Sequence, residues 1–224
     1  MSSSSLPVAV VTGASQGVGL AVTTLLLDAG YFVYAQYNTT IAELHHPHLQ
    51  WWHADFGTEI TLPAQLAAEA EVHALILCAG VARLGSTHDQ PLGEWKWHMD
   101  VNFYGPVTLT QLLLPQLRAA AGQVVYVNSG AGMATAPQWG AYSASKHAAR
   151  AWCEALRQET PEIRVASLYP GRIATHMQRR IRAQEKGEYT AKEYLQAGTV
   201  ARTIVEMLQQ PADAYQIDVI LRPR

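Results

Sequence analysis

The chain has 224 residues, of which 49% are hydrophobic and 15% charged, and its 16 basic and 18 acidic side chains give a formal net charge of −2. This composition is typical of one globular domain with a full hydrophobic core, and it excludes a disordered chain. A nearly neutral chain lacks the broad basic field that dominates nucleic-acid binding, so we expect no nucleic-acid partner.

The cysteines and the first residues bear on where the protein works. Cys78 ends an apolar run and Cys153 lies in a helical pattern. Both are therefore expected to be small core residues in a reducing compartment rather than parts of a disulfide framework. The polar start 1–5 and the brief apolar run 8–11 do not form the pattern of a signal peptide, and we expect no membrane span. These features predict a soluble, cytoplasmic protein.

Short apolar runs recur along the chain, with helical patterns between them. Most of the runs are continuous rather than alternating, which is typical of strands buried on both faces of a parallel sheet. The expected strands are 8–11, 32–35, a weaker one at 49–53, 73–78, 124–127, 165–168 and 217–221.

The helical patterns between these runs predict helices at 18–29, 61–71, 95–118, 142–159 and 199–209. The first ends at Gly30, because glycine readily adopts the left-handed conformation that follows a helix. The third is expected to break near Gly105-Pro106, since proline lacks an N–H and crowds the preceding turn. The alternation predicts a single α/β domain over 1–224, a doubly wound, Rossmann-like parallel sheet of about seven strands with helices on both faces.

A glycine-rich segment, Thr12-Gly13-Ala14-Ser15-Gln16-Gly17-Val18-Gly19, follows the first expected strand and opens directly into a helix. Glycines let the backbone turn sharply and approach a pyrophosphate, and the helix N-terminus offers free N–H groups to the anion. A glycine-rich turn without a ligand is the alternative, but the order of strand, loop and helix favours a nucleotide site. The spacing is TGxxxGxG rather than the common GxGxxG.

Tyr142 and Lys146 form a YxxxK pair at the start of an expected helix. Four residues advance a helix by about 400°, so the two side chains lie on one face. A neighbouring ammonium favours the phenolate and lowers the pKa of a tyrosine, which suits Tyr142 to exchange a proton with a carbonyl oxygen or an alcohol. Ser129 follows an expected strand, where its hydroxyl is placed to bond a substrate oxygen. The alternative is a Tyr and a Lys that meet on an exposed helix.

With these motifs the chain resembles a single-domain member of the short-chain dehydrogenase/reductase family along nearly its whole length. The matching segments are Thr12–Gly19 (TGxxxGxG), Asp55 with Phe56 after the third strand, Leu77–Gly80 (NNAG), Asn102–Gly105 (NxxG), Ser129, Tyr142-xxx-Lys146 (YxxxK) and Pro170–Thr175 (PGxxxT). Cys78 replaces the second asparagine of NNAG, so a supporting hydrogen bond between central strands is expected to be lost.

The resemblance implies a catalytic set of four residues. Tyr142 is then the general acid/base, and Ser129 orients and polarises the substrate oxygen. Lys146 holds the nicotinamide ribose and lowers the pKa of Tyr142. Asn102 supports a water-mediated proton relay to Lys146.

The resemblance also implies a bound nicotinamide dinucleotide. Asp55 would bind the adenine, Phe56 would line the adenine pocket, and Ile173 and Thr175 would fix the nicotinamide carboxamide. The expected cofactor contacts are Gly13, Ser15, Gln16, Gly17, Val18, Gly19, Tyr37, Asn38, Asp55, Phe56, Ala79, Gly80, Asn102, Tyr142, Lys146, Pro170, Gly171, Ile173 and Thr175.

The choice between the two forms of NAD(P) depends on the end of the second strand. The segment Gln36-Tyr37-Asn38-Thr39 holds no carboxylate that would repel a 2′-phosphate, and neither it nor Gln16 in the loop offers a cation to pair with one. The sequence therefore favours NADP slightly over NAD.

Other features support weaker expectations. His45, His46 and His48 match no zinc spacing, so a solvated loop is expected and no metal site. The resemblance makes residues 172–198 the substrate lid. Its basic side chains suit either a pocket for an acidic substrate or, as we favour, an exposed helix of mixed charge.

Other side chains in the resembling segments border the site or its partner surfaces. Trp139, Met133 and Arg83 follow motif positions that often border the substrate pocket in the family. The alanine-rich pattern 142–159 corresponds to a helix that often packs against its symmetry mate. A homodimer or homotetramer is therefore expected.

These features predict an NAD(P)-dependent oxidoreductase that interconverts a small alcohol and its ketone or aldehyde, with no nucleic-acid or membrane partner. One alternative is a non-catalytic, dinucleotide-binding regulatory protein on the same fold, which would not need Asn102, Ser129, Tyr142 and Lys146 together. Another is a Rossmann-like methyltransferase, which would bind S-adenosylmethionine and have no use for YxxxK.

Overall fold

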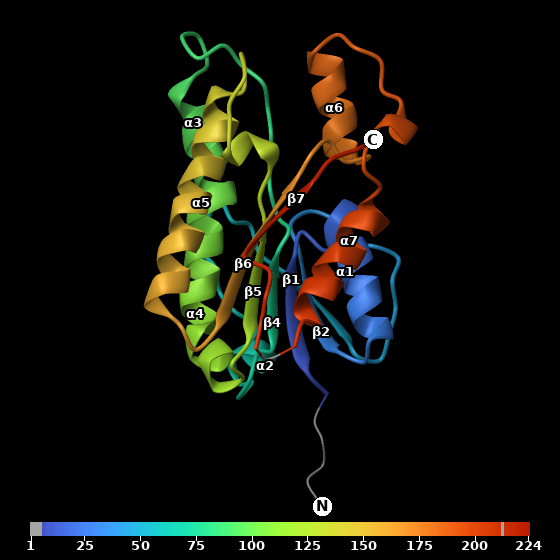
Figure 1. Ribbon diagram of the computed structural model, residues 1–224, viewed down its shortest axis with the longest axis vertical. Helices are drawn as coiled ribbons and strands as arrows, with labels where there is room; N and C mark the ends of the chain where they lie inside the picture. The colour runs from blue at the N-terminus through green and yellow to red at the C-terminus, as the bar shows by residue number, and fades with distance from the viewer. Residues whose placement is uncertain (1–5, 212) are drawn as a thin grey trace, which may run out of the picture.

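The computed structural model describes residues 6–211 and 213–224. These residues form one sheet of seven parallel strands in the order β3-β2-β1-β4-β5-β6-β7 (Figure 1). The doubly wound α/β fold is thus confirmed. The strands are β1 (Val8–Thr12), β2 (Phe32–Tyr37), β3 (Leu49–His53), β4 (Ala74–Leu77), β5 (Gln123–Val127), β6 (Arg164–Pro170) and β7 (Asp218–Leu221).

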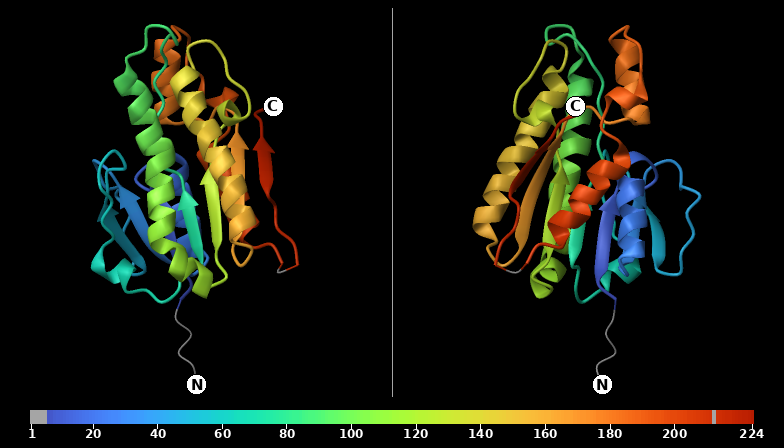
Figure 2. Two further views of the ribbon diagram at one scale, coloured as in Figure 1. Left: turned by 90° about the vertical axis from the view of Figure 1, so that its left-hand side faces the viewer. Right: turned by 45° about the vertical axis from the view of Figure 1, so that its right-hand side comes forward.

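Helices cover both faces of the sheet. One face carries α1 and α7 and the other α3, α4 and α5, while α6 stands beyond the carboxyl ends of the strands (Figures 1 and 2). The α-helices are α1 (Gly17–Asp28), α2 (Ala64–Ala67), α3 (Leu92–Met99), α4 (Gly105–Ala119), α5 (Gly140–Glu159), α6 (His176–Gln184) and α7 (Ala197–Leu208). Three short helices complete the described chain: the π-helix η1 (Asp100–Tyr104) and the 3₁₀ helices η2 (Gly130–Gly132) and η3 (Ala191–Glu193).

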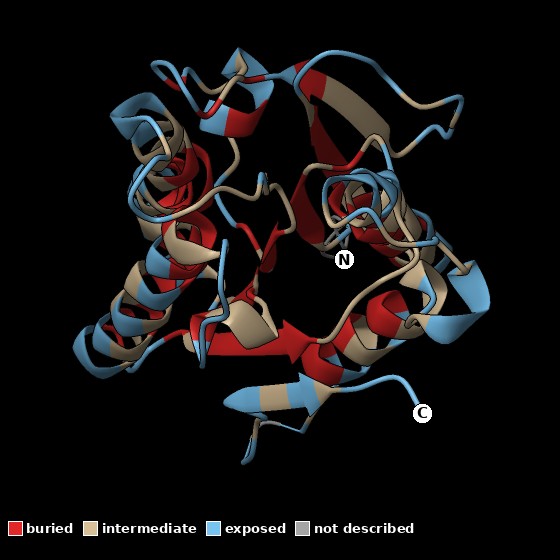
Figure 3. Ribbon diagram, turned by 90° about the horizontal axis from the view of Figure 1, so that it is seen from above, coloured by how far each residue is buried: buried red, intermediate tan, exposed pale blue. Residues whose placement is uncertain are grey.

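The sheet divides the core into two layers, because successive side chains of a strand point to opposite faces. Leu75 of β4 packs with Leu109 and Leu113 of α4, whereas its neighbour Ile76 packs with Leu26 of α1 on the other side. The central strands are buried on both faces, and β7 at the edge is partly exposed (Figure 3). Continuous apolar runs in the sequence therefore marked the central strands correctly.

Two helix predictions differ from the structure. The expected helix 61–71 is limited to Ala64–Ala67, which begins after Pro63 and buries one side chain, Leu66. One buried residue is too little apolar contact to stabilise three helical turns. The segment 176–184, expected to be an exposed helix of mixed charge, is helical and buries Gln178 and Ile181.

The predicted break at Gly105-Pro106 is also corrected. The chain stays helical from Leu92 to Ala119, because the turn before Gly105 widens to a π-helix in which the Gly105 N–H donates to Asp100 O. Pro106 then falls in the first turn of α4, where a missing N–H is tolerated. Insertions of this kind are frequent at functional sites.

None of the helices in the described part of the chain is long and apolar enough to span a membrane.

Candidate active site

A cleft of about 470 Å³ lies at the carboxyl ends of the central strands. Its walls are the loops that follow β1, β4, β5 and β6, together with α6. Most of the residues predicted to act meet there: Gly13, Gln16, Gly17, Val18, Gly19, Ala79, Gly80, Ser129, Tyr142, Lys146, Pro170, Gly171, Ile173 and Thr175.

The glycine loop has space for backbone and for no side chain. A Cβ at Gly19 would lie 2.2 Å from Gly13 O, and one at Gly13 would lie 2.9 Å from the Ala79 backbone. Gly13 and Gly17 have φ of 61° and 57°, in the left-handed region that favours glycine. A Cβ at Gly17 would lie 3.3 Å from Thr175 Cγ2, so the loops after β1 and β6 face each other closely. This bare cradle at the N-terminus of α1 fits the pyrophosphate of a dinucleotide.

Gln36 holds this loop in place. Its side-chain Oε1 accepts a hydrogen bond from the Gly13 N–H (2.7 Å), and its Nε2 donates to Ala54 O (2.6 Å). The Gln36 carbonyl also accepts from the Ala14 N–H (2.9 Å). The carboxamide is buried and has both ends bonded within the protein, so it serves the loop rather than a ribose.

Tyr142 and Ser129 face each other across the cleft floor. Ser129 precedes η2, and its Oγ accepts from the Ala131 N–H (3.1 Å). Tyr142 lies in the first turn of α5 with its side chain in edge contact with Trp139, ring centres 5.6 Å apart. Burial raises the pKa of Tyr142, and a hydrogen bond with Ser129 lowers it by less. The phenol is therefore protonated at neutral pH and suited to give a proton to a substrate oxygen.

Lys146 lies one turn further along α5, 3% exposed. Its Nζ donates to Tyr126 Oη (3.1 Å) and to Val127 O (3.0 Å) and lies 6.0 Å from the Tyr142 ring centre. Burial lowers the pKa of Lys146 to about 7. Burial is the largest influence on the pKa of Tyr142, and the lowering of that pKa by Lys146, which the resemblance implies, stays a prediction.

Asn102 lies in η1 behind the cleft and has its side chain fully bonded. Its Oδ1 accepts from the Val81 N–H (2.8 Å), and its Nδ2 donates to Val81 O (3.0 Å) and Ser145 Oγ (3.0 Å). Its main-chain carbonyl accepts from the Tyr126 hydroxyl. The side chain therefore joins η1 to α5 and to the chain after β4, which positions Lys146 from behind.

Comparison with known proteins agrees with this geometry. A sequence model of the family described as short chain dehydrogenase matches residues 7–186. The chain belongs to the short-chain dehydrogenase family. This membership agrees with the glycine cradle and the shared cleft.

Three similar proteins carry names that agree with this family. The chain is 33% identical over 189 residues to an NADPH-dependent 3-dehydrocapnine reductase of Ornithobacterium rhinotracheale (75% of this chain, 66% of that protein). It is 30% identical over 191 residues to dehydrogenase/reductase SDR family member 7B of Xenopus tropicalis (76% of this chain, 62% of that protein). A short-chain dehydrogenase of Burkholderia cenocepacia solved with NADP has a TM-score of 0.80 at 25% identity, covering 96% of this chain and 88% of that one. The alignments span about two thirds of the length of these curated relatives.

Several residues that the resemblance assigns to the cofactor do not line this cleft. Ser15, Tyr37 and Asn38 are not among its lining residues, and the Asp55 carboxylate accepts from the Gly57 N–H (2.9 Å) within its own loop. Phe56 is buried in the core, where a Cβ at Gly105 would lie 2.6 Å from it. Phe56 packs against the start of α4, and its place beside an adenine stays a prediction.

The departure at Cys78 leaves β1 and β4 joined. The Ala79 N–H donates to Thr12 Oγ1 (3.0 Å), so the threonine of the glycine motif supplies a hydrogen bond between the ends of these strands. The bond expected to be lost with the missing asparagine thus has a counterpart here.

Of the three expected pocket walls, Trp139 lines the cleft. Met133 is exposed, and Arg83 pairs with Glu94 and stacks over Trp97, 5.0 Å from its ring centre. The described residues bring together no group of three His, Cys, Asp or Glu that would hold a metal, including the loop of His45, His46 and His48.

Sequence reasoning missed two buried polar residues. Tyr126 contacts both Lys146 and Asn102, and the signal for it was a hydroxyl-bearing side chain inside an aliphatic strand, where it needs a partner. His98 is fully buried 6.3 Å from the Tyr142 ring, accepts from the Arg83 N–H and bonds Glu94 O. Burial lowers the pKa of His98, and both of its nitrogens are occupied, so it packs the floor as a neutral ring.

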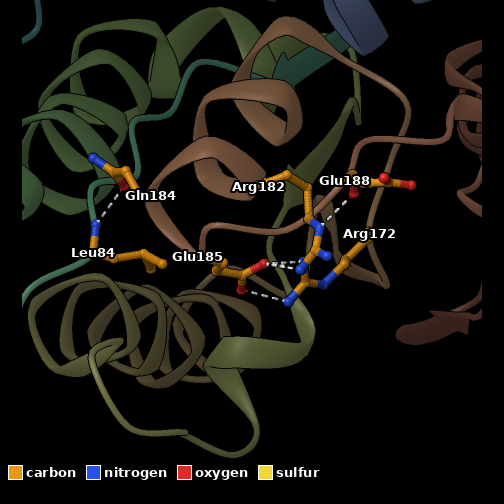
Figure 4. Close-up of polar contacts among 6 residues, drawn as sticks. All are labelled: Leu84, Arg172, Arg182, Gln184, Glu185 and Glu188. Carbon is orange, nitrogen blue, oxygen red and sulfur yellow. Dashed lines mark hydrogen bonds and ion pairs between the residues drawn. The ribbon is translucent and has the colours of Figure 1, made fainter.

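A network of charges closes the segment 172–198 on itself (Figure 4). Glu185 binds Arg172 through both carboxylate oxygens (2.6 and 2.7 Å) and also accepts from Arg182 (2.5 Å). Gln184 Oε1 accepts from the Leu84 N–H (3.0 Å), which ties the end of α6 to the opposite wall of the cleft. Since Arg172 and Arg182 are paired internally, the favoured interpretation of mixed charge agrees with the structure better than a pocket for an acidic substrate.

Replacing Glu185 with Gln is expected to loosen this segment. The variant keeps the shape but loses the charge between Arg172 and Arg182, and bonds to charged groups contribute about 1.5–3 kcal/mol each before solvent screening. We expect amide hydrogen exchange in 176–188 to quicken by about tenfold, with the exchange of β1 and β4 unchanged. Glu188→Gln is the matched control, because the contact from Arg182 is to the Glu188 main-chain oxygen.

The effect depends on pH in a defined direction. The Arg172 contact lowers the pKa of Glu185 below its ordinary value. The stabilisation is therefore present above the unfolded-state pKa and lost as pH falls through the folded-state pKa, so parent and variant should converge in acid. Equal exchange rates at neutral pH would contradict the role given to Glu185.

Proposed function

We propose that this protein is an NADPH-dependent oxidoreductase that interconverts an alcohol and its ketone or aldehyde. One observation carries the proposal: Ser129, Tyr142 and Lys146 line the same cleft as the glycine cradle. A proton donor, a hydroxyl that bonds a carbonyl oxygen and a site for a dinucleotide are the groups that such a reaction needs. The 33% identical reductase from Ornithobacterium uses NADPH, which supports the same cofactor here.

The residues of the cleft divide the work. When bound, a nicotinamide supplies the hydride. The glycine loop and the N-terminus of α1 would hold the pyrophosphate, and Ile173 and Thr175 would face the nicotinamide end. Ser129 would orient the substrate oxygen, and Tyr142 would give it a proton during reduction. Lys146 would donate a hydrogen bond to the ribose through the one Nζ proton that is not bonded to Tyr126 or Val127.

The pKa of Tyr142 favours the reductive direction at neutral pH. Burial raises the pKa of the Tyr142 phenol above its ordinary value, so the phenol carries the proton that a carbonyl oxygen must receive. Reduction should persist into the alkaline range, whereas alcohol oxidation, which needs the phenolate, should rise with pH.

Turnover can be tested on a panel of ketones and aldehydes with NADPH. The proposal expects loss of the NADPH absorbance with at least one of them, together with the matching alcohol. NADPH bound tightly and consumed with none of them would favour a regulatory dinucleotide-binding protein instead. Binding of S-adenosylmethionine rather than NADPH would favour the methyltransferase alternative.

Cofactor choice should follow the charge at the end of β2. We expect NADPH to bind more tightly than NADH, because the segment 36–39 holds no carboxylate to repel a 2′-phosphate. Asn38→Asp should weaken NADPH binding by about tenfold, the size of one close like-charge contact, and leave NADH binding within about twofold. Asn38→Ser is the control, and titration of the nucleotide fluorescence gives the Kd values. A preference for NADH in the parent would reverse this assignment.

We propose in addition that the protein is a cytoplasmic homodimer or homotetramer, with 172–198 as its substrate lid. The free thiols Cys78 and Cys153 suit a reducing compartment. The outer faces of η1, α4 and α5 expose Tyr104, Leu112 and small alanines, which suit close packing of helices. Light scattering on the purified protein tests the assembly, and a monomer at micromolar concentration would contradict it.

A further inference from the structure

Tyr126 joins the two residues behind the cleft. It is the fourth of the five residues of β5 and is fully buried. Its hydroxyl donates to the main-chain carbonyl of Asn102, and Lys146 Nζ donates to the same hydroxyl (3.1 Å). The lysine Nζ also lies 4.6 Å from the centre of the Tyr126 ring, within reach of a cation–π contact.

The direction of these bonds is fixed by the groups that make them. A carbonyl only accepts, so the hydroxyl proton of Tyr126 is committed to Asn102 and an oxygen lone pair faces Lys146. The Asn102 carbonyl is available because Pro106, four residues on, lacks the N–H that would bond it in an α-helix. The acceptor for Tyr126 is thus built into the helix that carries Asn102.

These contacts use two of the three outer valences of Lys146 Nζ. One proton goes to Tyr126 Oη and one to Val127 O (3.0 Å). Lys146 also lines the cleft, so the third valence points to the open side, where it holds a proton in the ammonium and a lone pair in the amine. We propose that Tyr126 is a positioning residue that keeps the exchangeable valence of Lys146 turned toward the cleft and Tyr142. Its catalytic part rests on the proposed function.

The other ionisable groups around Lys146 leave this role to Tyr126. The groups that face it in the described structure are Cys78, directly after β4, Tyr126 of β5, and Tyr142 and Cys153 of α5. Burial raises the pKa of each thiol to about 12, so both are neutral at pH 7. Burial also raises the pKa of both tyrosines, which are therefore neutral at pH 7. Of these four ionisable groups, Tyr126 is the one that accepts a hydrogen bond from Nζ.

Tyr126→Phe removes the hydroxyl and keeps the ring. Because the ammonium loses an acceptor, the pKa of Lys146 should fall by about one unit. Uniform ¹³C labelling of lysine reports this directly, since the chain has four lysines and the Lys146 Cε signal is assigned by its loss in Lys146→Gln. Tyr169→Phe is the matched control, a fully buried tyrosine of the neighbouring strand β6 whose hydroxyl has no hydrogen-bond partner among the described residues.

Kinetics give a second measurement. In Tyr126→Phe we expect kcat for carbonyl reduction to fall about tenfold, with the Kd for NADPH within about threefold. Tyr169→Phe should match the parent in all of these.

The outcomes separate this proposal from the proposed function. An unchanged Lys146 midpoint in Tyr126→Phe would overturn the positioning role, whether or not the parent reduces a carbonyl. If the Lys146 midpoint shifts in Tyr126→Phe but the parent reduces no carbonyl compound, the contact would be upheld and the proposed function would be removed. If Tyr126→Phe does not fold, 3-fluorotyrosine at position 126 keeps the shape and weakens the oxygen as an acceptor, and the midpoint should still fall.

Discussion

Replacing Tyr142 with Phe is expected to lower kcat for carbonyl reduction by about a thousandfold, within the range that one positioned proton donor contributes. The hydroxyl is the group in the cleft that is both protonated at neutral pH and next to Ser129. The ring remains to pack against Trp139 and His98, so the fold should persist. The Kd for NADPH should stay within about threefold, because the glycine cradle is untouched. Steady-state rates and a fluorescence titration measure the two effects.

The control for this change is Tyr104→Phe. Tyr104 lies in η1 and is 54% exposed, so its hydroxyl contributes nothing to the cleft. It should keep the rate of the parent. A Tyr142→Phe enzyme that turns over as fast as the parent would remove Tyr142 from the chemistry, and with it the assignment of the cleft as a reductase site.

Gly19→Ala is expected to abolish nucleotide binding and to destabilise the fold. The new Cβ would lie 2.2 Å from Gly13 O and 3.1 Å from Ala14 Cα, contacts with backbone that has nowhere to move. Overlap of this kind costs about 1–3 kcal/mol or more, and the shifted loop would no longer present its N–H groups to a pyrophosphate. We expect a lower Tm and at least a hundredfold weaker binding of NADPH.

The matched control is Gly93→Ala in α3. A Cβ there meets no atom within 4 Å in the described structure, and alanine is the better helix former, so its stability should equal or exceed that of the parent. Measuring Tm with and without NADPH separates the two effects of Gly19→Ala. A Tm that still rises with NADPH as in the parent would show that the loop does not hold the nucleotide.

The strands were predictable from sequence because their apolar runs are continuous. All seven were expected at the places where they lie, including the weaker β3 (Leu49–His53). Helix ends and breaks were harder, because they depend on tertiary contact. Pro63 is a local signal that the helix predicted at 61–71 starts later, whereas its early end at Ala67 reflects the burial of a single side chain, Leu66. Pro106 predicts a break in the helix, but the π-helix before it places Pro106 in the first turn of α4, where no N–H is needed.

The site residues that belong to a sequence motif were predictable, whereas those that depend on packing in the folded chain were not. Ser129, Tyr142 and Lys146 were expected together, and the structure brings them to one cleft. The effect of burial on Tyr142 and Lys146 was not foreseeable, since a pKa depends on how much water the fold removes. Tyr126 sits inside a buried strand, and its partners come from α5 and η1, which only the folded chain brings together.

Transfer of deuterium from NADPH that carries deuterium at both C4 positions of the nicotinamide tests the shared cleft most directly. With a carbonyl compound that the parent consumes, mass spectrometry of the alcohol should show one deuterium at the former carbonyl carbon, and Tyr142→Phe should form this product about a thousandfold more slowly. An alcohol that carries no label, or equal labelling rates in parent and variant, would contradict a hydride and proton delivered together in this cleft.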